Sequence, residues 1–126
     1  MNTTPATDSL ITARLLATAR YTAVLNVLLF VLSAQRGGAW SAVQLVLASA
    51  LLYYHIRIEF DRRVFQDFAD GRYTPEAFDQ ALRQTGLRRV SDGLSMPQRV
   101  SGALALWRKS LYLTAAQSAV FLIQIL

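Results

Sequence analysis

Three apolar segments, separated by one short polar stretch and one long charged stretch, limit what this chain can fold into. They cover residues 15–34, 39–56 and 103–126. A helix needs about 20 apolar residues, at roughly 1.5 Å of rise each, to cross a hydrocarbon core of about 30 Å. Each segment is close to that length. The sequence therefore predicts an all-α integral membrane protein with three transmembrane helices and a small cytoplasmic helical hairpin between the second and third.

We expect a single membrane domain over residues 1–126. Its parts are a flexible tail (1–9), a first span (10–34), a second span (39–56), a cytoplasmic helical insert (57–101) and a third span (102–126). The purely apolar part of the last segment is only just long enough to cross. A final helix that lies on the membrane surface therefore stays open as an alternative.

The basic residues are distributed unevenly around these segments. Of the 13 Lys and Arg, Arg14 and Arg20 lie at the start of the first segment and Arg36 lies between the first and second. The remaining ten lie between Arg57 and Lys109. Positive residues collect on the cytoplasmic side of membrane proteins. We therefore expect an inner-membrane protein with the N-terminus and the insert inside, and with the C-terminus outside.

Composition narrows the possible chemistry. The chain has no Cys, which excludes disulfides, thiolate metal sites and cysteine nucleophiles. A net charge of +5 would suggest nucleic-acid binding in a soluble protein. Here acidic residues alternate with the basic ones beside the expected bilayer, so we expect no nucleic-acid partner. Twelve of the thirteen basic residues are Arg, which favours a GC-rich bacterial source.

Three amide side chains lie inside the apolar segments: Asn26, Gln44 and Gln117. An amide in a span usually bonds to a neighbouring helix, and such a bond contributes about 0.6–2 kcal/mol. We therefore interpret these residues as interhelical polar contacts. The alternative is that they line a path for a solute, because polar residues in spans also mark transport routes.

The insert carries clear start and stop signals. Gly71 is suited to end the helix that leaves the second span, and Thr74 followed by Pro75 is typical of a helix start. Gly86 is suited to end this second helix. Residues 87–96 are expected to form a loop. Together these signals predict the short helical hairpin.

The stretch from Tyr53 to Asp70 places most of its apolar side chains on one side of a helical wheel. Arg57 and Asp61 project from that same apolar side, one turn apart. They either form an ion pair with each other or bind a partner protein or a lipid phosphate. We predict a partner-docking surface formed by Arg57, Asp61, Phe65, Phe68, Phe78 and Leu82.

Two other pairs have the i,i+4 spacing of helical neighbours. Asp79 and Arg83 are placed for an ion pair. His55, the single histidine, shares a face with Glu59, but two ligands do not make a metal site without a third. We therefore expect no metal and no other cofactor.

The five residues from Asp67 to Gly71 resemble the opening of the motif of the CDP-alcohol phosphatidyltransferases. In that family of membrane enzymes, aspartates at the inner ends of helices bind metal ions. The second half of the motif, an Ala-Arg pair followed by a spaced Gly and two Asp, is missing after Arg72, and the chain is too short for that fold. The resemblance therefore does not assign the family's activity.

We favour a non-catalytic accessory or assembly subunit of a larger cytoplasmic-membrane complex. The insert is too small to be stable alone, yet its well-capped helices present aromatic side chains. Expected partners are membrane lipids and either a larger membrane-protein complex or further copies of this chain. Two alternatives stay open: a small self-associating transporter or channel, and a lipid-processing enzyme that uses Asp61, Asp67 and Asp70 with a divalent ion.

Overall fold

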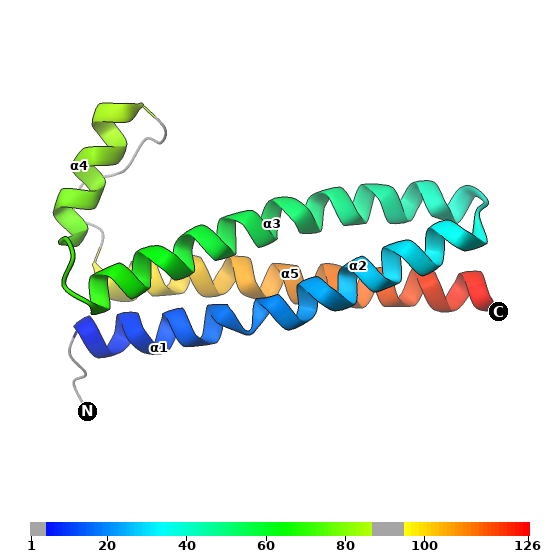
Figure 1. The fold of residues 1–126 in the computed structure, drawn as a ribbon, viewed down its shortest axis with the longest axis horizontal. Helices are drawn as coiled ribbons and strands as arrows, with labels where there is room; N and C mark the ends of the chain where they lie inside the picture. Colours follow the sequence, from blue (N-terminus) through cyan, green and yellow to red (C-terminus); the bar gives the residue numbers. More distant parts are fainter. Residues whose placement is uncertain (1–4, 87–94) are drawn as a thin grey trace.

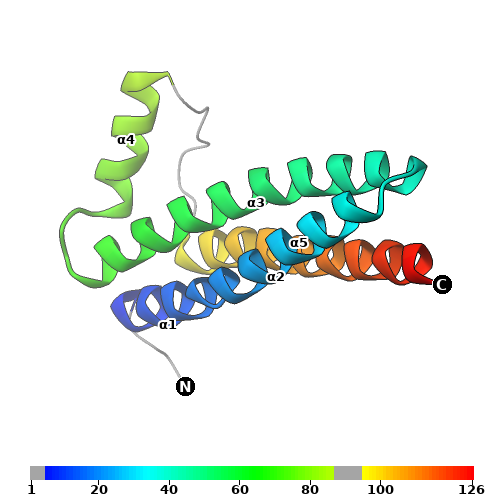
Figure 2. The ribbon, with the colours of Figure 1, turned by 45° about the vertical axis from the view of Figure 1, so that its right-hand side comes forward.

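The computed structural model describes residues 5–86 and 95–126, and every regular element in that part of the chain is an α-helix. The helices are α1 (Pro5–Ala17), α2 (Ala19–Arg36), α3 (Ala39–Ala69), α4 (Pro75–Thr85) and α5 (Met96–Ile125). The predicted all-α class is confirmed. In Figures 1 and 2, α1 and α2 follow one another as a single rod beside α3 and α5, while α4 stands away from them at one end.

The first rod is interrupted at Thr18, between α1 and α2. The Thr18 N–H donates to the carbonyl of Leu15 at 3.1 Å, three residues back instead of four. The Thr18 hydroxyl donates to the same carbonyl at 2.6 Å. Side chains that bond back to the helix backbone disturb its hydrogen-bond ladder. The interruption therefore has a local chemical cause and leaves the rod continuous.

Helix α1 begins earlier than predicted, because residues 5–9 are helical and not part of a tail. Pro5 is compatible with a first turn, where its missing N–H costs nothing, and Asp8 complements the positive end of the helix dipole. Ser9 is fully buried and its hydroxyl lies 3.6 Å from the sulfur of Met96 in α5. Packing against a distant helix thus orders this segment.

The other helix ends are set by local caps, and both ends of α4 lie where the capping signals predicted them. Gly37 follows α2 with a positive φ of 69°, which reverses the chain into α3. Thr74 caps α4 by accepting a backbone N–H, and Gly86 ends it in the left-handed conformation. Ser95 caps α5 in a reciprocal capping box. Most of the predicted loop, residues 87–94, lies outside the described part of the chain.

The interior changes character along the bundle. Toward the α4 end most buried side chains are apolar (Ala13, Leu16, Ala19, Ile58, Val64, Phe65, Phe68 and Ala103), beside the polar Ser9, Thr12 and Asp79. Toward the other end most are polar (Asn26, Ser33, Gln44, Ser110, Thr114 and Gln117), beside Leu29 and Leu51. Around this polar interior, large apolar side chains are exposed, among them Val24, Val27, Leu28, Val46, Leu52, Leu122 and Ile123. A soluble bundle has the reverse arrangement.

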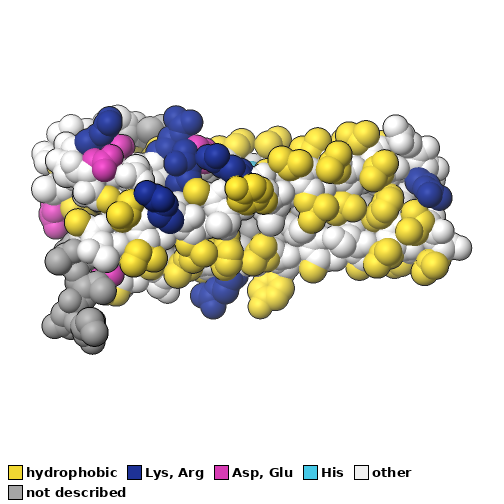
Figure 3. All heavy atoms as spheres, turned by 60° about the horizontal axis from the view of Figure 1, so that its bottom comes forward, with side chains coloured by type: hydrophobic (Ala, Val, Ile, Leu, Met, Phe, Trp, Pro, Cys, Tyr) yellow, Lys and Arg dark blue, Asp and Glu magenta, His cyan; other side chains and the backbone are white. Residues whose placement is uncertain are grey.

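Two stretches of helix, Ala6–Arg36 and Ala39–Ala69, are long and apolar enough to cross a membrane. The α3 helix has 31 residues, which corresponds to about 46 Å, so it is longer than a hydrocarbon core of about 30 Å. On the face drawn in Figure 3, most charged side chains gather toward the α4 end, and apolar side chains are spread along the rest of the bundle. Charged and apolar side chains are thus distributed unequally along this face.

A candidate docking cavity between α3, α4 and α5

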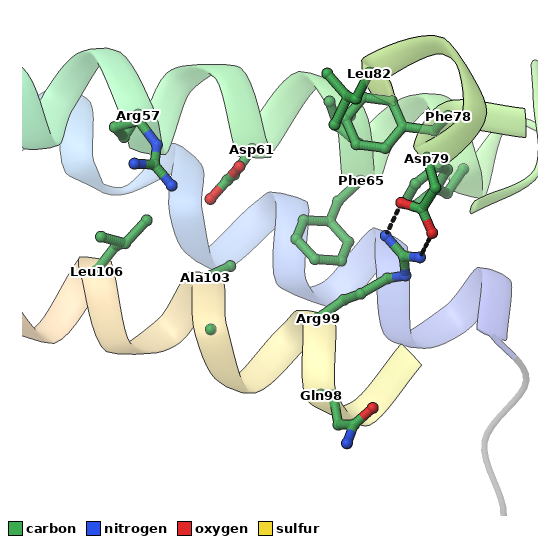
Figure 4. Close-up of a pocket in the computed structure, with 13 residues that line it drawn as sticks. Arg57, Asp61, Phe65, Phe78, Asp79, Leu82, Gln98, Arg99, Ala103 and Leu106 are labelled. Carbon is green, nitrogen blue, oxygen red and sulfur yellow. Dashed lines mark hydrogen bonds and ion pairs between the residues drawn. The ribbon is translucent and has the colours of Figure 1, made fainter. Parts of the chain in front are cut away.

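A cavity of about 370 Å³ lies between the last turns of α3, helix α4 and the first turns of α5. All six residues of the predicted docking surface line it: Arg57, Asp61, Phe65, Phe68, Phe78 and Leu82. Figure 4 shows side chains from the three helices around the cavity. The sequence did not indicate the remaining lining residues, Val64, Asp79, Gln98, Arg99, Gly102, Ala103 and Leu106.

Aromatic contacts attach α4 to the end of α3. The Phe78 ring of α4 lies 5.8 Å from Phe68 in an edge-to-face arrangement and stacks on Tyr73 at 6.0 Å. Such pairs contribute about 0.5–1.5 kcal/mol each beyond the area they bury. Phe68 and Phe65 are 9% and 4% exposed, so they belong to the core and form the inner wall of the cavity. A partner could reach them only through the cavity.

An ion pair fixes α4 to α5. Arg99 Nη1 donates to Asp79 Oδ1 at 3.0 Å, and Arg99 Nη2 donates to Asp79 Oδ2. The two side chains are 11% and 8% exposed, so the pair is largely removed from water. Asp79 is thus paired across helices with Arg99, a partner that the sequence did not indicate. Among the described residues, the buried Arg99 Nε has no hydrogen-bond partner.

Arg57 and Asp61 both line the cavity, one turn apart on α3 (Figure 4). Arg57 Nη1 donates to the Tyr53 hydroxyl at 2.8 Å, and its guanidinium lies 5.8 Å from the centre of the Tyr53 ring. Arg57 is therefore held by a hydrogen bond and a cation–π contact one turn back along α3. The charge of Arg57 therefore lies at the part of the cavity that is nearest the apolar N-terminal half of α3.

The acidic residues considered for an enzyme are held by local contacts. Asp67 accepts a hydrogen bond from the Tyr73 hydroxyl at 2.9 Å, and burial together with this bond raises the pKa of Tyr73 to about 12. Asp70 accepts from Gln66 at 3.1 Å. Neither aspartate lines the cavity with Asp61. Within the described ranges, no group of three or more His, Asp or Glu could hold a metal ion.

The three amide side chains that we predicted to bond between helices lie together, in the half of the bundle whose interior is polar. Asn26 Nδ2 donates to Gln117 Oε1 at 2.9 Å and to Thr114 Oγ1 at 3.0 Å. Gln117 Nε2 donates to the backbone carbonyl of Asn26 at 3.2 Å, and Gln44 Nε2 donates to the backbone carbonyl of Gln117 at 3.0 Å. His55 Nε2 lies 2.8 Å from Asn26 Oδ1. Together these five residues form a polar layer between the helices. Its members Thr114 and His55 were not predicted from the sequence as interhelical contacts.

Comparisons with protein-family models, with curated proteins and with solved structures find no match. Function is therefore argued from the geometry of this chain. What that geometry offers is a partly apolar cavity with charged groups on its wall, in the half of the bundle that has an apolar interior and a charged surface.

Proposed function

We propose that this chain is a three-span inner-membrane protein with its N-terminus in the cytoplasm and its C-terminus outside. The polar interior and apolar exterior of one half of the bundle support a lipid environment, in which polar contacts and not apolar burial hold helices together. Helix α5 shares this pattern, with Gln117 fully buried and Leu122 and Ile123 exposed. The concentration of Arg at the α4 end supports the orientation.

Within that membrane placement, we propose a non-catalytic accessory or assembly subunit of a larger complex. The observation that carries this proposal is the cavity between α3, α4 and α5, which opens in the half of the bundle that would project into the cytoplasm. Its volume falls within the roughly 300–1,000 Å³ of ligand-binding pockets. Apolar walls with a few charged groups suit a side-chain anchor from a partner, the usual centre of an interface.

The polar layer favours this proposal over a transporter. Asn26 and Gln117 bond to each other through side chains and backbone, and Gln44 Nε2 donates to the Gln117 backbone, although among the described residues the buried Gln44 Oε1 has no hydrogen-bond partner. A solute path would need such groups to face an open passage. In this bundle they instead hold the spans together, which is the role an accessory subunit requires of its membrane part.

Gly102 offers the sharpest test, because it lines the cavity and a Cβ at this position meets no atom within 4 Å. A Gly102→Leu variant should therefore fold and fill the cavity from within. We expect the amount of partner that co-purifies from native membranes to fall about tenfold, the loss that corresponds to removing one anchor contact. Quantitative mass spectrometry of the purified complex measures this change.

The matched control is Gly102→Ala, which leaves the cavity open. Alanine in a helix interior is about 0.5–1 kcal/mol more favourable than glycine, so this variant should be slightly more stable and should keep the partner. The proposal fails if wild type, Gly102→Ala and Gly102→Leu recover the same proteins in the same amounts.

A further inference from the structure

A second hollow, of about 210 Å³, lies between α3 and the junction of α1 with α2. Its apolar wall includes Leu16, Ala19 and Ala23, and its polar wall includes Arg20, His55 and Glu59. The hollow lies where the apolar core gives way to the polar layer, since Leu16 belongs to the core and His55 bonds to Asn26. It is separate from the docking cavity and shares no residue with it.

The charged side chains on the wall of this hollow are Arg20 and Glu59. Glu59 accepts hydrogen bonds from Arg62 at 2.9 Å and from Arg63 at 3.0 Å. These bonds, that from Arg62 above all, lower the pKa of Glu59 to about 2, so its carboxylate stays ionised at neutral pH. Because two guanidinium groups outside the hollow already offset the Glu59 carboxylate, Arg20 is the cation on the wall that an anion could bind.

The surroundings of the hollow fit the cytoplasmic edge of a bilayer. Arg20 is exposed near the start of the apolar part of the first rod, and the next residue, Tyr21, is 74% exposed. Tyrosine concentrates at membrane–water interfaces, and an arginine there extends its charged end toward the headgroups. From this level the exposed side chains of α2 are apolar, beginning with Val24 and Leu25. A molecule with a charged headgroup and an apolar tail would match both the charged level at Arg20 and the apolar surface of α2 next to it.

We infer that this hollow binds the phosphate of an anionic phospholipid of the cytoplasmic leaflet, with Arg20 as the main phosphate ligand. Basic pockets between membrane helices on the cytoplasmic side are suited to anionic headgroups. The small side chains of Ala19 and Ala23 leave room beside Arg20 for the glycerol region of the lipid. The inference rests on the membrane placement proposed above, and it does not depend on the protein partner.

The test reconstitutes the full chain into vesicles of phosphatidylcholine mixed with phosphatidylglycerol, extracts it in mild detergent and measures the lipid that remains bound. Wild type should be enriched in phosphatidylglycerol over the vesicle composition. An Arg20→Gln variant should lose about fivefold of that preference, because one cation near an anionic surface is worth roughly that factor. Arg14→Gln is the matched control, since Arg14 is exposed on α1 but does not line the hollow.

A second variant separates a defined site from diffuse attraction. Ala23→Leu fills the hollow without changing charge, so it should lose the preference as Arg20→Gln does. Equal enrichment in wild type and in Arg20→Gln, an equal loss in Arg14→Gln, or displacement of the lipid by inorganic phosphate alone would each overturn the inference. A chain that alkaline washing removes from the vesicles would overturn the membrane placement as well, so the two failures are distinguishable.

Discussion

An Asp79→Ala variant is expected to weaken the attachment of α4 to the bundle by about 3 kcal/mol. The substitution leaves Arg99, which is 11% exposed, without the carboxylate that accepts two of its hydrogen bonds. An 11-residue helix is only marginally stable alone, so α4 should open more often. Trypsin cleavage after Arg83 should accelerate on the order of a hundredfold. Limited proteolysis in detergent followed by mass spectrometry measures this rate.

Two further variants show whether the lost ion pair causes this effect. Gln80→Ala changes an exposed neighbour on α4 and should leave the cleavage rate nearly unchanged. The double variant Asp79→Leu with Arg99→Met removes both charges and should recover most of the protection, because an apolar pair often replaces a buried ion pair without loss. Equal cleavage of wild type and Asp79→Ala would show that the pair does not hold α4.

An Asn26→Leu variant is expected to destabilise the membrane half of the bundle by about 2 kcal/mol. Asn26 bonds to Thr114 and Gln117 of α5 and to His55 of α3, so its removal leaves partners unsatisfied on two helices. The free energy of unfolding, measured by titrating denaturing detergent into mild micelles, gives the size of the effect.

Ser49→Ala is the matched control for the polar layer. Ser49 is an exposed span residue whose hydroxyl bonds only within its own helix, to the carbonyl of Leu45 at 2.9 Å. Its removal should change stability by less than about 0.5 kcal/mol. If Asn26→Leu and Ser49→Ala have the same effect, the layer does not hold the helices together. A double variant of Asn26 and Gln117 should lose less than the sum of the single losses, because the two share a bond.

Features that depend on neighbouring residues could be predicted from the sequence. The start of α4 at Thr74 and Pro75 and its end at Gly86 are set by residues within one helical turn. The position of Asn26 within an apolar segment likewise indicated a bond to another helix, because lipid offers an amide no alternative partner.

Features that depend on packing between distant segments could not be predicted. Asp79 is paired with Arg99, which is 20 positions along the chain and belongs to another helix, so no local spacing indicates the pair. Phe65 was assigned to a docking surface from its helical face, and the same face packs into the core against α1 and α5. The order of residues 5–9 similarly depends on the contact of Ser9 with α5.

The central claim is that three helices cross the membrane and leave α4 in the cytoplasm. Because the chain has no Cys, single substitutions Gln35→Cys, Thr85→Cys and Leu126→Cys can each be labelled with an impermeant maleimide on intact cells. All three positions are exposed. We predict that positions 35 and 126 react from outside and that position 85 reacts only after the membrane is permeabilised. If positions 126 and 85 both react only after permeabilisation, α5 does not cross and the account is contradicted.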